Sequence, residues 1–366
     1  MSEKFVKNRI QVLIAVSAHF LILLIPLSMP VYAGGEVAAW GDDYYSQCDV
    51  PEPNINFAAV SAGESHALGL KTDGAIAAWG DNYFGQCDVP EPNTGFTAVA
   101  AGEWHSLGLE SDGAIVAWGD DEDGQCAVPL LNTGFTAIAA GYWHSLGLKI
   151  DGSILAWGWN EYGQCDVPEP NAGFIAVAAG YWHSLGLKAD GSIAGWGNND
   201  YGQCDVPLPN TGFVAVAAGI YHSLGLKADG SIVAWGWNED GQCDVPPNTD
   251  FTAVSAGLSH SLGLRANGYI AAWGDSSSGQ CDVPAPNTFF TAIAAGEWYS
   301  LGLKGFAGDI NDSRAVDFFD YAALASHWMD TNCSQPDYCS GVDIDHDGDV
   351  DAVDLSAIAF NWLEGK

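Results

Sequence analysis

Two twelve-residue stretches near the C-terminus carry oxygen-bearing side chains at alternate positions. The stretch 309–320 aligns with the stretch 343–354 at a step of 34 residues. Calcium takes six to eight oxygen ligands, and a loop that wraps around the ion presents alternate side chains to it. The duplicated spacing therefore predicts calcium as a cofactor. Each stretch is followed by an apolar pair at i, i+4 spacing, which indicates a helix with one apolar face: Leu324 and Trp328, then Ile358 and Trp362.

Both stretches resemble the calcium loops of dockerins. The resemblance implies a small all-α domain over residues 306–366, with two EF-hand-like loop–helix units. It also implies calcium ligands at positions 1, 3, 5, 7, 9 and 12 of each loop. The residue at position 7 binds through its main-chain carbonyl group and the residue at position 9 binds through a water molecule. Gly348 eases the turn of the second loop, whereas Arg314 stands in that place in the first, so we expect the second loop to bind more tightly. The implied ligands are Asp343, Asp345, Asp347, Asp349, Asp351 and Asp354, and Asp309, Asn311, Ser313, Ala315, Asp317 and Asp320.

The dockerin resemblance implies a cohesin-like protein as partner. Dockerins recognise cohesins largely through two adjacent positions near the end of each loop, where Ser/Thr pairs are frequent. This chain has Phe318 and Phe319, then Ala352 and Val353, at these positions. Between the two halves, Cys333 and Cys339 flank a short polar loop, and in an exported chain we expect them to form a disulfide.

The rest of the chain is a repeat of about 39 residues. Trp-Gly recurs with Trp at positions 40, 79, 118, 157, 196, 235 and 273. A His-Ser pair recurs with it, but adjacent residues on a strand point to opposite faces, so we predict a structural role rather than a nucleophile and its base. The recurring cysteines are interpreted as small buried side chains, with disulfides or a metal as alternatives: Cys48, Cys87, Cys126, Cys165, Cys204, Cys243 and Cys281.

Each repeat contains three short strand candidates, most with Asp-Gly or Asn-Gly between the second and third, a hairpin signal. The segment through Gln-Cys-Asp-Val-Pro predicts an outer strand or a connection. One such sheet cannot bury its faces alone, so the copies must pack together. The first Trp-Gly strand, 36–41, lacks a preceding partner and the last His-Ser-type strand, 299–303, lacks a following one. We therefore predict that these two ends pair and close a ring.

The repeat pattern Ala-Gly-x-x-His-Ser-Leu-Gly-Leu-Lys-x-Asp-Gly resembles the regulator of chromosome condensation repeat over residues 35–304. It is most similar to the short secreted bacterial members, among them the propeller-type β-lactamase inhibitory protein. The resemblance implies an all-β, seven-bladed propeller, which we place at 34–305. We do not carry over the nuclear role of the eukaryotic members in small-GTPase exchange, because export and the charge of the chain argue against it.

The first 33 residues read as a cleaved export signal, with a basic start, an apolar run and the exit Val31-Tyr32-Ala33. We therefore expect a secreted or cell-surface protein without a membrane span after cleavage. Removing this segment leaves 8 Lys and Arg against 45 Asp and Glu, a net charge of −37. Such a surface repels polyanions, which excludes nucleic acid as a partner.

Variation between the repeats is concentrated in two loops, where binding should occur. After Trp-Gly we predict exposed, ligand-binding aromatic residues: Tyr44, Tyr45, Tyr83, Phe84, Trp159, Tyr162, Tyr201 and Trp237. The aromatic residues directly before His are predicted to pack between blades. These features indicate a monomeric, noncatalytic binding propeller for an extracellular protein, or alternatively a glycan-binding accessory to polysaccharide breakdown. A glycoside hydrolase using acids such as Glu103 or Asp120 is disfavoured, because no pair of acids stands out among the repeats.

Overall fold

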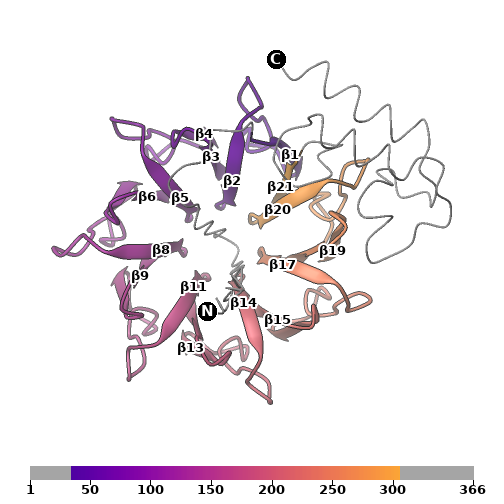
Figure 1. Cartoon of the computed structure of the whole chain (residues 1–366). Coiled ribbons are helices and arrows are strands. Elements are labelled where there is room, and N and C mark those ends of the chain that lie inside the picture. The colour runs from indigo at the N-terminus through magenta and orange to yellow at the C-terminus, as the bar shows by residue number, and fades with distance from the viewer. Residues whose placement is uncertain (1–33, 306–366) are drawn as a thin grey trace, which may run out of the picture.

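Seven three-stranded antiparallel sheets surround a central axis in the computed structural model, which describes residues 34–305 (Figure 1). The inner strands are β2 (Phe57–Ala62), β5 (Phe96–Ala101), β8 (Phe135–Ala140), β11 (Phe174–Ala179), β14 (Phe213–Ala218), β17 (Phe251–Ala256) and β20 (Phe290–Ala295). The middle strands are β3 (His66–Lys71), β6 (His105–Glu110), β9 (His144–Lys149), β12 (His183–Lys188), β15 (His222–Lys227), β18 (His260–Arg265) and β21 (Tyr299–Lys304). The outer strands are β4 (Ile76–Gly80), β7 (Ile115–Gly119), β10 (Ile154–Gly158), β13 (Ile193–Gly197), β16 (Ile232–Gly236), β19 (Ile270–Gly274) and β1 (Glu36–Gly41).

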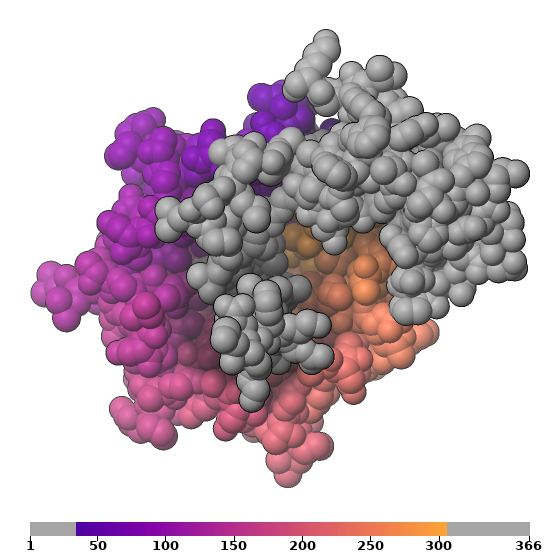
Figure 2. All heavy atoms as spheres, in the orientation of Figure 1, coloured from indigo at the N-terminus to yellow at the C-terminus, as the bar shows by residue number. Residues whose placement is uncertain are grey.

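The two ends of the repeat array share one sheet, as predicted. Strand β1 pairs antiparallel with β21, so that Glu36 lies opposite Lys304 and Gly41 lies opposite Tyr299. We number the blades in chain order, from blade 1 (β2–β4) to blade 6 (β17–β19), and blade 7 is β20, β21 and β1. The blades follow one another around the disc in chain order, from indigo through magenta to orange (Figure 2). The ring is therefore closed by a strand from the start of the array.

The segment after each outer strand is a connection, and the alternative of a fourth strand is not observed in the described residues. An asparagine in this connection covers the open edge of the outer strand. In blade 1, Asn93 Oδ1 accepts a hydrogen bond from the Ile76 N–H (2.7 Å), and its Nδ2 donates to the Ile76 carbonyl (2.8 Å). Every blade repeats this pair of bonds, which satisfies backbone groups that would otherwise invite pairing with another chain.

The core lies between blades and is built from the repeated Phe, Leu, Ile and Trp side chains. The Trp of each outer strand is anchored to the preceding blade; Trp118 Nε1, for example, donates to the Gln86 carbonyl at 2.9 Å. The glycine after this Trp is needed for two reasons. Gly80 has a φ of 100°, and a Cβ there would lie 2.5 Å from the Ser65 carbonyl oxygen. Close approach of the strands thus explains the repeated Trp-Gly.

The described residues contain no helix long and apolar enough to cross a membrane. The predicted export signal over 1–33, the dockerin-like domain over 306–366 and the Cys333–Cys339 disulfide lie outside the described residues.

Candidate functional site

The recurring His and Ser form a belt of hydrogen bonds between neighbouring blades. His66 Nε2 lies 2.9 Å from Ser106 Oγ of the next blade, and the same contact recurs at five further junctions. Ser106 Oγ donates its only proton to the Gln86 carbonyl at 2.8 Å, so His66 Nε2 must be the donor to Ser106. The same serine-to-carbonyl bond at the other junctions places a proton on Nε2 of each histidine. This confirms that His and Ser of one copy do not pair with each other.

The seam between blades 7 and 1 departs from this belt in two places at once. Tyr299 replaces His in blade 7, and Ala67 replaces Ser in blade 1, and both side chains are fully buried. Tyr299 belongs to the same apolar cluster as Ala67 and donates its hydroxyl hydrogen bond to the His66 carbonyl. The larger ring thus occupies the space that the smaller residue leaves, and the closing junction differs from the other six.

Burial lowers the pKa of all six belt histidines from 6.5 to about 3 or 4. The unfolded chain therefore binds more protons than the folded one between these values, and stability is lost as pH falls from about 6.5. Burial raises the pKa of Glu103 to about 10 and that of Glu297 to about 8, so these two groups act in the opposite direction in this window, against six histidines.

We expect the free energy of unfolding, measured by denaturant titration, to fall steeply between pH 7 and pH 5. Each histidine contributes up to about 1.4 kcal/mol per pH unit below its unfolded pKa. A His105→Asn variant should show a shallower slope, since one titrating group is missing. A free energy of unfolding that is constant or rises toward pH 5 would contradict the neutral belt.

The seven repeat cysteines are free thiols and half-buried. Each Sγ lies 3.2–3.4 Å from a main-chain carbonyl oxygen in its own loop. Burial raises the pKa of these thiols to about 11 or 12, which makes them poor nucleophiles and poor metal ligands. The disulfide alternative is therefore not observed for these seven residues.

Twelve aromatic side chains form one connected cluster on the face where the inner and outer strands end. Neighbouring ring centroids are at most 6.4 Å apart, and the cluster runs from the loop after blade 1 to the loop after blade 5. We call it the aromatic arc. Its members are Tyr83, Phe84, Trp104, Tyr142, Trp143, Trp159, Tyr162, Tyr181, Trp182, Tyr201, Tyr221 and Trp237.

Six of the eight loop aromatics predicted to bind a ligand lie in the arc. Tyr83 is 84% exposed, Tyr162 and Tyr201 are also exposed, and Phe84, Trp159 and Trp237 are half-buried. Tyr44 and Tyr45 contact each other, and among the residues that the structure describes they contact no other ring. The aromatics before His were predicted to pack between blades. Trp104, Trp182 and Tyr221 do contact rings of the preceding blade, as where Trp104 stacks on Phe84 at 4.8 Å, whereas Trp143 contacts rings of its own blade.

Trp159 and Trp237 stand where the other repeats have an acid or amide that completes the loop. In blade 2, Asp120 accepts a hydrogen bond from Gln125 Nε2 at 2.8 Å, which gives Asp120 a structural role. In blade 3, Trp159 takes the place of this acceptor, and the buried Gln164 Nε2 has no hydrogen-bond partner in the described part of the chain. The indole N–H of Trp237 is also buried, and no group of residues 34–305 accepts its hydrogen bond. The arc therefore replaces satisfied polar contacts with aromatic ones.

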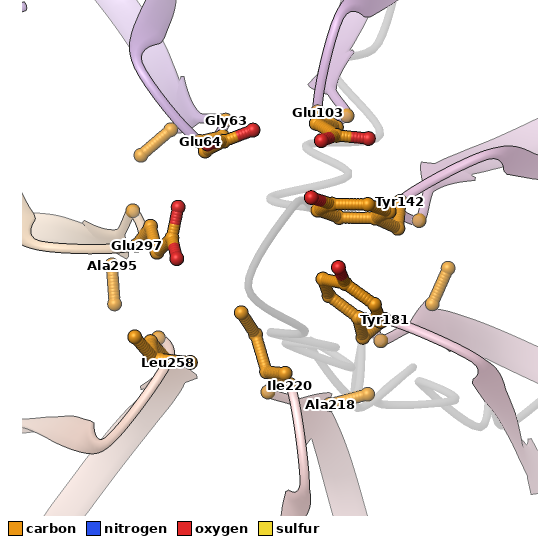
Figure 3. A pocket seen from close by; sticks show the side chains of 18 of the residues that line it. Gly63, Glu64, Glu103, Tyr142, Tyr181, Ala218, Ile220, Leu258, Ala295 and Glu297 are labelled. Atoms are coloured by element: carbon orange, nitrogen blue, oxygen red, sulfur yellow. The ribbon is translucent and has the colours of Figure 1, made fainter. Parts of the chain in front are cut away.

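A small opening of about 80 Å³ lies on the axis of the same face. Its wall consists of Ala-Gly pairs that end the inner strands, and the next residue of each blade forms the rim (Figure 3). We call this opening the axial mouth. Its seven rim residues are Glu64, Glu103, Tyr142, Tyr181, Ile220, Leu258 and Glu297.

Glu103 is the most buried polar residue of the rim, at 2% exposure. Neither of its carboxylate oxygens has a hydrogen bond of good geometry within the described residues. Burial raises the pKa of Glu103 to about 10; the adjacent Tyr142 hydroxyl opposes this rise and the Glu64 carboxylate adds to it. Burial and the charge of Glu64 also raise the pKa of Glu297. The rim was not predicted as one site from the sequence. An alignment of the residue that follows Ala-Gly in each repeat would have identified its seven members.

The model of the regulator of chromosome condensation (RCC1) repeat matches residues 57–86, 96–125, 135–164, 174–203, 213–242 and 251–280. The seventh blade is divided between the two ends of the array, so it contains no uninterrupted copy. The model of the dockerin type I domain matches residues 307–359. No curated protein is similar enough in sequence to count as a match.

Solved structures of low sequence identity share this fold. Prp20, the yeast RCC1, bound to Kap60 is 18% identical with a TM-score of 0.63, covering 83% of this chain and 95% of its own. Prp20p from Saccharomyces cerevisiae, in a second structure, is 17% identical with a TM-score of 0.62, covering 75% and 92%. Human WBSCR16 is 17% identical with a TM-score of 0.59, covering 74% and 98%. At these identities the likeness shows the fold alone.

Proposed function

Because the chain is a propeller of RCC1 repeats followed by a dockerin type I domain, we propose that it is an exported, noncatalytic binding subunit. In this proposal the dockerin domain attaches the protein to a cohesin, and the aromatic arc of the propeller holds a second protein. The two halves of the chain would then join a partner to an extracellular assembly.

The dockerin type I domain implies a cohesin partner and suggests an extracellular location. Dockerin type I domains typically bind calcium. The donor set of this chain fits that ion, because carboxylate and amide oxygens at alternate positions are ligands that calcium prefers. The finer assignment of individual ligands, with the second loop binding more tightly than the first, is part of the proposal.

The observation that carries the binding role is the exchange of a structural acceptor for tryptophan at Trp159 and Trp237. A buried amide without a partner costs free energy, on the order of 1–3 kcal/mol, and Gln164 Nε2 is left in that state. Sequences keep such local conflicts mainly where function requires them. Large aromatic side chains are also the residues that dominate protein interfaces.

The packing within the arc favours a protein over a glycan as the ligand. Sugars stack on the open face of an aromatic ring, but rings in the arc cover one another. Trp159, for example, makes an edge contact with Trp143 at 5.1 Å and with Tyr162 at 5.3 Å. A clustered and partly covered aromatic surface matches a protein hot spot, in which anchors are shielded from water.

To test this function, the exported chain would be immobilised through its dockerin domain on a cohesin and exposed to proteins secreted by the same organism. We expect saturable capture of a protein, which is then purified and measured against the propeller at defined concentrations. Binding to a glycan array without any protein partner would replace the proposal with the polysaccharide alternative. Release of sugar from polysaccharide would overturn the noncatalytic assignment.

Calcium removal should abolish attachment to the cohesin. We expect chelation, or the double substitution Asp343→Ala with Asp345→Ala, to weaken cohesin binding at least about 100-fold, because these acids neutralise the ion and fix the loop. Titration calorimetry with calcium alone should show the loss of the tighter site. Asp309→Ala in the weaker loop is the matched control and should cost less. Cohesin binding that is unaffected by chelation would contradict this prediction.

A further inference from the structure

The three glutamates of the axial mouth have no counter-cation within residues 34–305. Glu297, Glu64 and Glu103 come from the adjacent blades 7, 1 and 2, so they form one continuous acidic side of the rim. The described residues contain six Lys and Arg side chains, and each lies over a phenylalanine ring at the far end of a middle strand, on the opposite face. No described cation can therefore neutralise the acidic side.

The acidic side points into the opening with unsatisfied oxygens. Figure 3 shows the carboxyl groups of Glu64, Glu103 and Glu297 around the axial mouth. Both oxygens of Glu103 and Oε2 of Glu64 are buried without a hydrogen-bond partner among the described residues. Burial raises the pKa of Glu103 to about 10, so this side chain carries a proton in the empty mouth at neutral pH, and an arriving ammonium group displaces that proton and pairs with the buried carboxylate.

The opposite side of the rim is aromatic and aliphatic. Tyr142 and Tyr181 follow Glu103 around the circle, and Ile220 and Leu258 complete it (Figure 3). Tyrosine rings attract cations through their π faces, whereas isoleucine and leucine favour a hydrocarbon chain. The rim thus presents two complementary surfaces, one for a positive charge and one for an apolar stem.

The spacing of the carboxylates disfavours a metal ion. Within residues 34–305, no group of three His, Cys, Asp or Glu side chains is placed to hold one. A metal ion needs its oxygens at about 2–2.6 Å, and the three glutamates, which come from separate blades, are not among any such group in these residues. An organic cation is larger, forms several hydrogen bonds, and can reach carboxylates that do not converge on a point.

We propose that the axial mouth binds a single alkylammonium group, with its nitrogen at the carboxylates of Glu103 and Glu64 and its hydrocarbon chain along Ile220 and Leu258. The opening of about 80 Å³ admits one such group. The site does not depend on the aromatic arc having a protein partner, because the ligand is defined by the rim alone. A lysine side chain of a protein and a free amine share this chemistry.

Calorimetric titration of the whole exported chain with n-butylammonium chloride at low ionic strength tests the site. We expect a dissociation constant on the order of 1 mM, as befits a ligand of five heavy atoms. Glu103→Gln should weaken binding at least about tenfold. Glu122→Gln, which makes the same charge change on an exposed loop, should leave it unchanged. n-Butanol, which lacks the charge, should not bind.

Two further arms make the outcome decisive. The Nα-acetyl, C-amidated lysine should bind about as tightly as n-butylammonium if a protein side chain is the source, and binding of the free amine alone would assign a small metabolite. Glu64→Gln repeats the charge test at a less buried position, should Glu103→Gln fail to fold. Absence of ammonium binding, equal binding by Glu103→Gln and wild type, or displacement of the ammonium by equimolar calcium would overturn the proposal.

Discussion

A chain that begins at residue 42 should melt at least about 10 °C below one that begins at residue 34. Strand β1 supplies the outer strand of blade 7, with Val37 4% and Trp40 7% exposed. Trp40 Nε1 also donates to the Gln280 carbonyl at 2.9 Å, and this bond ties blade 7 to blade 6. Loss of a buried tryptophan alone costs about 3–5 kcal/mol, and each kcal/mol lowers the melting temperature by about 2–4 °C in a domain of this size.

The closing strand is also what covers the edge of β21. Without it, the backbone groups of Tyr299–Lys304 lie at an open sheet edge, so we expect aggregation on heating as well as an earlier melt. Calorimetry and light scattering measure the two effects. Glu36→Ala is the matched control, because Glu36 is the exposed residue of β1 and its loss should change the melt by less than about 2 °C. An unchanged melt without residues 34–41 would show that the ring does not need them.

The fold could be predicted because the beginning and the end of each repeat can be recognised in the sequence. The unpartnered strands 36–41 and 299–304 could be recognised by comparing each end with a complete copy, and the structure joins them. The hydrophobic pattern of each copy could be read in the same way. The register of the outer strand on the middle strand also follows from the alternation of side chains within one copy: Trp118 lies opposite Ser106, and Gly119 lies opposite His105.

The site was harder to predict because its contacts join different copies. His66 bonds to Ser106, 40 residues away, so inspection of one copy shows only that its own His and Ser cannot meet. The side-chain clamp of Asn93 on Ile76 spans 17 residues; the asparagine recurs in every repeat, but its periodicity does not say which backbone groups it bonds. The arc and the rim consist of residues that differ between copies. Which of these residues lie next to each other depends on the radius of the ring, and the sequence does not give that radius.

Trp159→Asp should abolish capture of the protein partner while leaving the propeller folded. Trp159 contacts Trp143, Tyr162 and Trp182 at the centre of the aromatic arc. A central tryptophan anchor typically contributes 2–4 kcal/mol to an interface, so we expect affinity to fall by about 30- to 1000-fold. Tyr44→Ala removes an 83% exposed aromatic residue outside the arc and should leave affinity unchanged.

A comparison of two substitutions at this position separates binding from stability. Asp restores the acceptor that Asp120 provides in blade 2, so Gln164 Nε2 regains a partner, whereas Ala restores nothing. We therefore expect Trp159→Asp to be more stable than Trp159→Ala by about 1 kcal/mol in denaturant titration, with equal loss of affinity. Equal stability of the two variants would mean that the missing hydrogen bond carries no cost, and the argument for selection at Trp159 would fail. An affinity loss confined to Tyr44→Ala would instead place the partner on the loop after strand β1, at the seam of the ring, where Tyr44 and Tyr45 lie outside the arc.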